Sequence, residues 1–285
     1  MHVHRLLKLY EQGIRDFAGV DLSGADLRGI TLIGINLSGA NLKGADFSRA
    51  FLTKSDLSEA QLNWANLSFV KLSEAKLVET DLTKTNLSGA FMVKSKLPRS
   101  KLSGANLSAT NLRGANLWGA NLCGANLERG NLRDTNLSGV NLNWANLSEA
   151  RLVGARLYGA SLNSVNLYKA CMKGVDLGGV DLEGVNLREA RLNGANLEGA
   201  NLVAADLSEA NLCRANLKRA DLTGANLTRA SLEEANLAWT VLTRAKLTYA
   251  DLSQAMLTGI NLEEVLPGGM VMEEATEEVS YLTAM

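Results

Sequence analysis

Leucine occupies every fifth position of the chain from residue 17 to residue 262. The exceptions are Phe17, Phe47, Met92 and Met172, which are also large and apolar. Two positions before each of them the chain nearly always carries Ala, Val, Ser, Thr or Ile. Asn or Asp usually precedes the large residue, and most of the 26 glycines stand two positions after it. The apolar period is therefore five, and no insertion interrupts it.

A period of five fits neither regular element. Five residues of an α-helix turn through about 500°, so successive leucines would be offset by about 140° and would form no stripe. On a straight strand, an odd period would place alternate leucines on opposite faces. The leucines can all face inward only when the chain turns once per unit. The pattern therefore predicts a solenoid of short extended segments with the leucine and the small residue inside, and glycine at the corners.

The stretch FMVKSKLPRSK at residues 91–101 differs in composition because it is basic and contains no acid. Met92 and Leu97 nevertheless keep the five-residue register, so the stretch belongs to the repeat and is no linker. Pro98 directly follows a central leucine. We expect it to remove one hydrogen bond between coils unless its nitrogen faces a turn.

The two ends differ from the repeats. Residues 3–14 carry apolar side chains at helical spacing, which predicts a helix that caps the first coil within a segment 1–15. The repeat region is assigned to 16–265, since Leu266-Pro267 and two glycines then break the pattern. Residues 266–285 form an acidic tail that is either mobile or a second short cap.

Units such as Ala105-Asn106-Leu107 and Ala115-Asn116-Leu117-Trp118-Gly119 follow the pattern A(N/D)LxG, which resembles the pentapeptide-repeat family over residues 16–262. The opening LLKLYEQGIRDF also resembles the leader of cyanobacterial members. The resemblance implies an all-β solenoid, specifically a right-handed quadrilateral β-helix. With four pentapeptides in each coil, the repeats would make about 12 coils.

Few residues have the chemistry of an active site. The two histidines, His2 and His4, lie outside the repeats, so the serines and cysteines of the repeats have no histidine base, and two ligands are too few for zinc. Cys123, Cys171 and Cys213 are odd in number and widely spaced. We expect no enzymatic activity, no metal and no cofactor. Without a long apolar run or a signal-like start, we expect a cytoplasmic protein that does not bind membranes.

Candidate function lies on the surface. Coils of 20 residues would align outward positions into columns. The outward residues on either side of each central leucine are called ladder positions below. One face then carries a basic stripe, with no acid in its ladder positions between the third and tenth coils. The stripe consists of Lys71, Arg113, Arg133, Arg151, Lys173 and Arg191. Phe51, Lys71 and Phe91 share a column, where two rings and a cation make a binding anchor. A second basic patch holds Lys94, Lys96, Arg99 and Lys101. The alternative is that these charges serve solubility alone, with Glu79 beside Arg99 partly neutralising the patch.

The sequence favours a non-catalytic scaffold that binds an unidentified protein partner, as a monomer or an end-to-end dimer. The resemblance implies a regulatory role, because some cyanobacterial relatives are linked to control of cell differentiation. Nucleic-acid binding through the basic stripe is an alternative. Some relatives mimic DNA and inhibit type II topoisomerases, which requires extended negative potential. The net charge is −1, and without the acidic tail the repeats are net positive, which opposes mimicry.

Overall fold

The computed structural model describes residues 1–261, Val265 and Val271. The helix α1 spans Val3–Glu11, within the range 3–14 that the apolar spacing predicts. From Asp16 to Met256 every fifth residue takes part in an isolated parallel β-bridge, in place of longer strands. The predicted acidic tail, 266–285, lies outside the described residues except for Val271.

Each bridge joins residues that are 20 positions apart. Bridges start at Asp16, Asp21, Asp26 and Thr31 before Asn36 returns to pair with Asp16. A coil therefore has 20 residues and four sides, as the resemblance implies. Val271 pairs with Asp251 in the same register.

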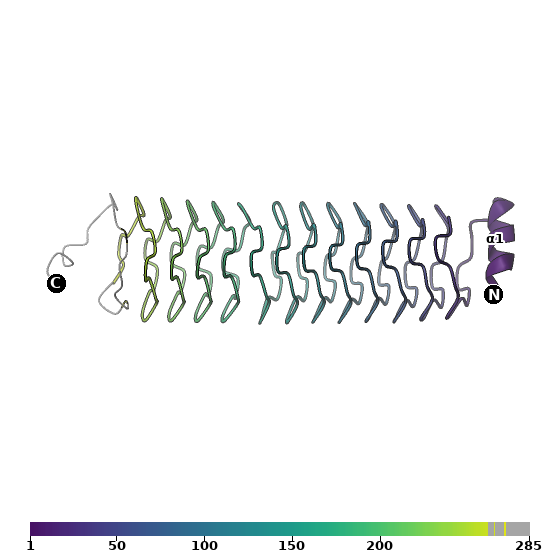
Figure 1. The fold of residues 1–285 in the computed structure, drawn as a ribbon, viewed down its shortest axis with the longest axis horizontal. Helices are drawn as coiled ribbons and strands as arrows, with labels where there is room; N and C mark the ends of the chain where they lie inside the picture. The colour runs from purple at the N-terminus through teal and green to yellow at the C-terminus, as the bar shows by residue number, and fades with distance from the viewer. Residues whose placement is uncertain (262–264, 266–270, 272–285) are drawn as a thin grey trace. The chain divides into compact units, whose positions relative to one another are not determined.

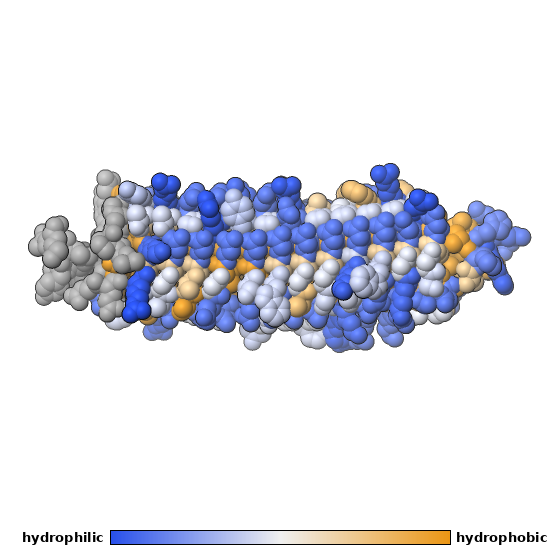
Figure 2. All heavy atoms as spheres, turned by 60° about the horizontal axis from the view of Figure 1, so that its bottom comes forward, coloured by the Kyte–Doolittle hydropathy of each residue, from blue (hydrophilic) through white to orange (hydrophobic). Residues whose placement is uncertain are grey.

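The chain divides into two compact units. The first comprises Met1–Ala150 with Ala155–Ala160, and the second comprises Arg151–Gly154 with Ser161–Met285. Within each unit the coils lie one on another (Figure 1). Figure 2 shows that polar side chains form columns on the visible face of these coils.

A repeated set of backbone hydrogen bonds holds one coil on the next. Leu52 N donates to Lys71 O at 2.8 Å, Lys54 N donates to Ser73 O at 3.0 Å, and Lys71 N donates to Ala50 O at 2.9 Å. Within the corner, Ser55 N donates to Leu52 O at 3.1 Å. Because Lys54 has φ 60° at the third turn position, the corner is a type II β-turn, which explains the many glycines at this position.

Pro98 fits this scheme without loss. The residue after a central leucine offers its carbonyl to the neighbouring coil and keeps its N–H for the turn, and Glu79 N donates to Pro98 O at 3.0 Å. The position is also the second of a type II turn, where proline is favoured. The sequence predicted that Pro98 would remove a hydrogen bond between coils unless its nitrogen faces a turn. The nitrogen does face a turn, so no hydrogen bond between coils is missing at this position.

The core is a column of leucines with small residues beside them. Leu52, Leu72 and Ala50 are fully buried, and Phe47 is accommodated in the same interior. Most buried hydroxyls at the small position donate to a backbone carbonyl: Thr80 Oγ1 reaches Leu57 O of the neighbouring coil at 2.7 Å, and Ser95 Oγ donates to Met92 O of its own turn at 2.7 Å, whereas Ser55 Oγ has no partner in the described part of the chain. The interior thus combines dispersion contacts with polar groups that are, for the most part, hydrogen-bonded.

The helix α1 lies against the first coil of the first unit (Figure 1). Its Leu6 is fully buried, and the Tyr10 hydroxyl donates to Ile33 O at 3.0 Å. Arg15 stacks on the Tyr10 ring with 3.8 Å between the guanidinium carbon and the ring centroid. The helix therefore covers apolar surface at the N-terminal end of the stack. No helix in the described part of the chain is long and apolar enough to span a membrane.

Candidate functional site: an aromatic and cationic surface

The column Phe51–Lys71–Phe91 is assembled as the spacing predicts. Parallel bridges join Phe51 to Lys71 and Lys71 to Phe91. The Lys71 ammonium lies 3.2 Å from the centroid of the Phe91 ring, which is a cation–π contact. Phe51 is 44% exposed and Phe91 is 42% exposed. Two partly exposed rings with a cation between them thus form an apolar surface that remains accessible to solvent.

At most other bridge positions, Asn or Asp makes hydrogen bonds that this column lacks. The Oδ1 atom of Asn66 accepts from Ser68 N at 3.2 Å, which caps the turn, and from Asn86 Nδ2 at 3.3 Å, one coil away. Phe91 has no such acceptor, and the N–H of Val93 has no protein acceptor among the described residues. The column therefore gives up hydrogen bonds that the common residue would make.

The residues of the basic stripe belong to both compact units. Arg113 and Arg133 belong to the first unit, whereas Arg151, Lys173 and Arg191 belong to the second. In the second unit, Cys171 bridges to both Arg151 and Arg191 and so stands between them.

One acid, Asp134, lies beside the stripe. It stands at a corner and so is not one of the ladder positions from which the stripe was predicted. Arg113 Nε is 3.7 Å from Asp134 Oδ2. Asp134 occupies a corner position with φ 59°, and a side chain there reaches the adjacent face. Arg113 is therefore compensated by an acid at a corner, a position that the search for acids at ladder positions did not cover, while the Arg133 side chain has no hydrogen bond or ion pair within the described residues.

The second basic patch is partly neutralised. Arg99 Nε donates to Glu79 Oε1 at 2.8 Å, and its guanidinium lies 5.8 Å from the Trp118 ring centroid. Lys101 bridges to Asp81 and Lys96 bridges to Lys76. Lys94 occupies a corner with φ 55°. The pairing of Arg99 with Glu79 matches the solubility interpretation for that residue.

Hydrogen bonds lower the pKa of Asp81, the acid that bridges to Lys101 of this patch. Burial raises the pKa of Asp81, but hydrogen bonds from Thr83 and Asn63 and the charge of Lys101 outweigh burial, so the pKa lies below its ordinary value. Asp81 is therefore a carboxylate at neutral pH, and its charge offsets that of Lys101.

The cysteines are half-buried free thiols. Burial raises the pKa of the Cys213 thiol, and nearby Glu233 acts in the same direction, which lowers its thiolate fraction. No group of three or more His, Cys, Asp or Glu side chains within the described residues is arranged to hold a metal ion.

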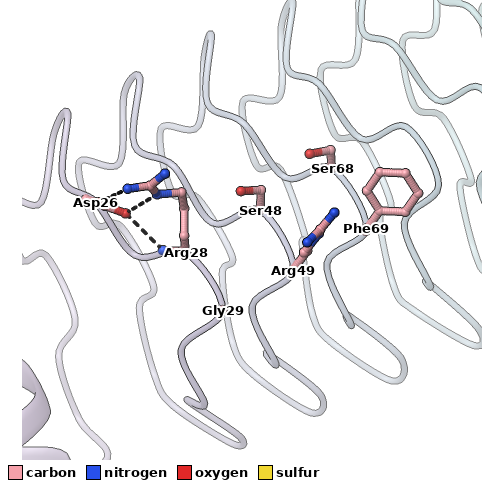
Figure 3. Close-up of a pocket in the computed structure, with 7 residues that line it drawn as sticks. All are labelled: Asp26, Arg28, Gly29, Ser48, Arg49, Ser68 and Phe69. Atoms are coloured by element: carbon pink, nitrogen blue, oxygen red, sulfur yellow. Dashed lines mark hydrogen bonds and ion pairs between the residues drawn. The ribbon is translucent and has the colours of Figure 1, made fainter.

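The structure also has a groove that the sequence interpretation missed. It lies on the first unit and has a volume of about 580 Å³. Figure 3 shows the side chains that line it. It is lined by Asp26, Arg28, Gly29, Ser48, Arg49, Ser68 and Phe69. These residues come from three successive coils, so they are adjacent only after the chain has folded. One signal was present in the sequence, because Arg49 and Phe69 stand at corner positions where glycine is common.

Comparison with known proteins identifies the repeat. The family described as pentapeptide repeats matches in eight copies, at residues 21–59, 60–97, 100–139, 141–179, 174–203, 181–219, 205–244 and 225–263. No match is found among curated proteins.

Several solved structures are similar. HetL of the cyanobacterium Nostoc sp. strain PCC 7120, described as a pentapeptide repeat protein involved in heterocyst differentiation regulation, is 31% identical, with 97% of this chain and 99% of HetL covered and a TM-score of 0.34. Protein alr5209, also a pentapeptide repeat protein from Nostoc PCC 7120, is 32% identical over 37% of this chain and 80% of its own, with a TM-score of 0.31. A variant of QnrB1, a plasmid-mediated fluoroquinolone resistance protein, is 16% identical over 90% and 91% of the two chains, with a TM-score of 0.35.

Proposed function

The chain belongs to the pentapeptide-repeat family, and we propose that it is a non-catalytic scaffold that binds a protein partner through the column Phe51–Lys71–Phe91. The proposal includes a regulatory role in the cytoplasm, as a monomer or an end-to-end dimer. Control of cell differentiation, which the resemblance to cyanobacterial members implies, belongs to the same proposal.

One observation supports the column above other surfaces. Phe51 and Phe91 are partly exposed at ladder positions where Asn would bond both to its own turn and to the next coil. Replacing that polar ladder by rings leaves apolar surface in water, which binding to a partner would remove. Aromatic side chains beside a cation are typical of the residues that dominate protein interfaces.

Direct binding of nucleic acid is the second candidate. It is supported by Arg133, whose side chain is unpaired among the described residues. It is weakened at Arg113, whose guanidinium already lies 3.7 Å from the Asp134 carboxylate. Phosphate binding falls steeply with ionic strength, whereas an interface anchored by aromatic rings does not, so a salt titration separates the two candidates.

The test is affinity capture from nuclease-treated lysate with the wild type and with a double variant, Phe51→Thr and Phe91→Asn. The new residues are those that Thr31 and Asn111 supply in the same column, so the coil is maintained. We expect the double variant to lose a partner that the wild type retains at both about 50 mM and about 500 mM salt, whereas a complex dependent on phosphate contacts would form at the lower salt concentration and dissociate at the higher one.

Tyr158→Ser is the matched control, because Tyr158 is 88% exposed in the first unit and lies outside the column. It removes an aromatic side chain of similar size and should leave capture unchanged. Circular dichroism checks the folding of each variant. Equal capture by the wild type and the double variant would refute the proposed anchor, and recovery of nucleic acid alone, without nuclease, would favour the second candidate.

A further inference from the structure

The groove on the first unit runs along one corner of three successive coils. Gly29, Arg49 and Phe69 occupy equivalent corner positions 20 residues apart, and Arg28, Ser48 and Ser68 precede them (Figure 3). The groove therefore changes in character along its length, from a charged end at Asp26 and Arg28 to an aromatic end at Phe69.

The charged end is internally neutralised. Arg28 Nε donates to Asp26 Oδ1 at 2.8 Å, and its terminal nitrogen donates to Asp26 Oδ2 at 2.6 Å. The bidentate bond orients both groups and leaves this pair without net charge. Asp46, one coil further, adds a carboxylate whose oxygen accepts from Ser48 N at 2.8 Å.

Arg49 is the cation that remains available. Its side chain makes no hydrogen bond or ion pair within the described residues, and its guanidinium lies between the Asp26–Arg28 pair and the Phe69 ring (Figure 3). A guanidinium presents a planar set of donors that matches a carboxylate in two-point contact. Arg49 can therefore receive one anionic group without breaking an existing pair.

Phe69 forms an apolar wall whose position depends on a glycine. A Cβ atom on Gly89 would lie 2.5 Å from Phe69 Cε1, so the ring lies across the glycine of the next coil. The ring is still 52% exposed. The aromatic end of the groove is thus a fixed, accessible surface beside the free cation.

Arg49 and Phe69 take a backbone conformation that glycine would adopt more easily. Arg49 has φ 60° and Phe69 has φ 58°, and the same column carries glycine on either side, at Gly29 and Gly89. Side chains with Cβ atoms are disfavoured in this region. Many corners of the described chain, such as Glu59 and Glu74, share this conformation, so the corner permits a large side chain without singling out Arg49 or Phe69.

We propose that the groove binds one carboxylate together with a neighbouring apolar side chain, as found in an acidic peptide segment of a protein partner. The carboxylate contacts Arg49 and the apolar side chain lies on Phe69. The inference rests on the proposed scaffold function and adds a second contact of defined chemistry.

The charge of the groove favours a single carboxylate over a nucleic-acid strand. Only Arg49 is free, Arg28 is already paired, and the carboxylates of Asp26 and Asp46 oppose a second negative group. A phosphate backbone carries a charge on every nucleotide and needs several cations. A peptide can place one glutamate beside one aromatic residue, which matches the order of Arg49 and Phe69.

The experiment measures binding of the peptide acetyl-Gly-Phe-Glu-Gly-amide to the ¹⁵N-labelled full chain by NMR chemical shifts. We expect the amide signals of Ser48, Arg49, Ser68 and Phe69 to shift together. The matched peptide with glutamine in place of glutamate should bind about fivefold more weakly, a factor in the range of one exposed ion pair. The peptide with alanine in place of phenylalanine should also bind more weakly.

Arg49→Gly is the variant of choice because glycine already occupies this corner at Gly29 and Gly89. It should abolish the preference for glutamate over glutamine. Lys54→Gly removes a cation from the following corner, where φ is also 60°, and should leave binding unchanged.

Equal binding of the glutamate and glutamine peptides to the wild type, or an unaltered preference in Arg49→Gly, would overturn the inference. So would a single-stranded oligonucleotide that shifts the same signals at lower concentration than the peptide. These results leave the capture experiment untouched, because its variants change Phe51 and Phe91 and keep Arg49. Loss of capture in that double variant would support the scaffold even if the peptide fails to bind.

Discussion

At the scale of the residue, the corner position decides how a side chain can be displayed. Glycines and other residues alike adopt φ near 60° there, from Gly124 at 65° to Lys54 at 60°. Residues with a Cβ atom lose about 1 kcal/mol or more in this conformation relative to glycine. A large side chain at a corner therefore carries a cost in stability relative to glycine, and many corners of the described chain, such as Glu59 and Lys84, bear this cost.

Gly89 and Gly124 provide a test of this argument. A Cβ atom on Gly124 meets nothing within 4 Å, whereas one on Gly89 meets the Phe69 ring. We expect Gly124→Ala to lower the free energy of unfolding by about 1 kcal/mol through φ alone. Gly89→Ala should cost about 1 kcal/mol more, because the ring must move.

Urea unfolding followed by circular dichroism measures both changes. Combining Gly89→Ala with Phe69→Ser, relative to Phe69→Ser alone, should reduce the cost of the alanine to that found at Gly124. If the two alanine substitutions cost the same in the wild-type background, the Phe69 ring does not lie across Gly89.

The Asp26–Arg28 pair predicts a response to pH. A hydrogen bond from the Arg28 side chain, followed by one from the Arg28 backbone, lowers the pKa of Asp26 from its ordinary 3.8 to about 2. A carboxyl group with a lowered pKa stabilises the folded state above its unfolded pKa, and this contribution disappears as the pH falls through about 2. The stability difference between wild type and Asp26→Asn should therefore be constant above pH 5 and shrink between about pH 4 and pH 2.

An NMR titration of the Asp26 carboxyl carbon measures the pKa directly. In Arg28→Gln the pKa should rise toward the ordinary value yet remain below it, since the backbone N–H of residue 28 still donates. An unchanged pKa in that variant would show that the guanidinium is not the main cause.

At the scale of the element, the type II corner explains which residues tolerate change. The residue after each central leucine donates its backbone N–H only when the bridge residue before that leucine supplies a side-chain oxygen. Ser108 N donates to Asn106 Oδ1 at 3.1 Å. The bridge residue two positions before Ser73 is Lys71, which has no side-chain oxygen, and the Ser73 N–H has no protein acceptor among the described residues. Pro98 shows that the turn accepts a residue without an N–H at this position.

Two serine substitutions at equivalent turn positions follow from this difference. Ser73→Pro should raise the free energy of unfolding by about 0.5–1 kcal/mol, because it restricts the unfolded chain and breaks no hydrogen bond. Ser108→Pro removes the bond to Asn106 and should be less stable than Ser73→Pro by about 1 kcal/mol. Thermal and urea unfolding measure both, and the reverse order would contradict the assignment of these N–H groups.

At the scale of the whole molecule, a stack of coils must manage its exposed ends. Every coil uses its backbone groups on both neighbours, so a terminal coil has unpaired groups that invite another chain. At the N-terminal end of the first unit, α1 buries Leu6 and donates from Tyr10 to Ile33 O. The helix thus covers surface on which another molecule would otherwise stack.

Leu6→Asp should release α1 and cause self-association. A buried charge without a partner is strongly unfavourable, so the helix is expected to leave the first coil while the ladder beyond it remains folded. Sedimentation velocity over a range of concentrations should then show a mass that increases with concentration. Tyr10→Phe keeps the apolar contact and removes the hydroxyl, so it should behave as the wild type. A Leu6→Asp protein with wild-type sedimentation would show that α1 does not block association.

The sequence by itself determined the class of fold, because a five-residue apolar period keeps its leucines inside only if the chain turns once per unit. It also located the apolar stretch that forms α1, and it placed Phe51, Lys71 and Phe91 in one column once a 20-residue coil was assumed from the resemblance.

Only the tertiary structure decided which side chains meet across coils. The coil length appears in the pairing of residue with residue 20 positions later, and no local preference encodes it. Asp134 reaches Arg113 from a neighbouring coil, and Arg49 is flanked by side chains from the coils before and after its own. Such contacts depend on side-chain directions at the corners, where a five-residue pattern specifies the position of the turn but not where a long side chain comes to rest.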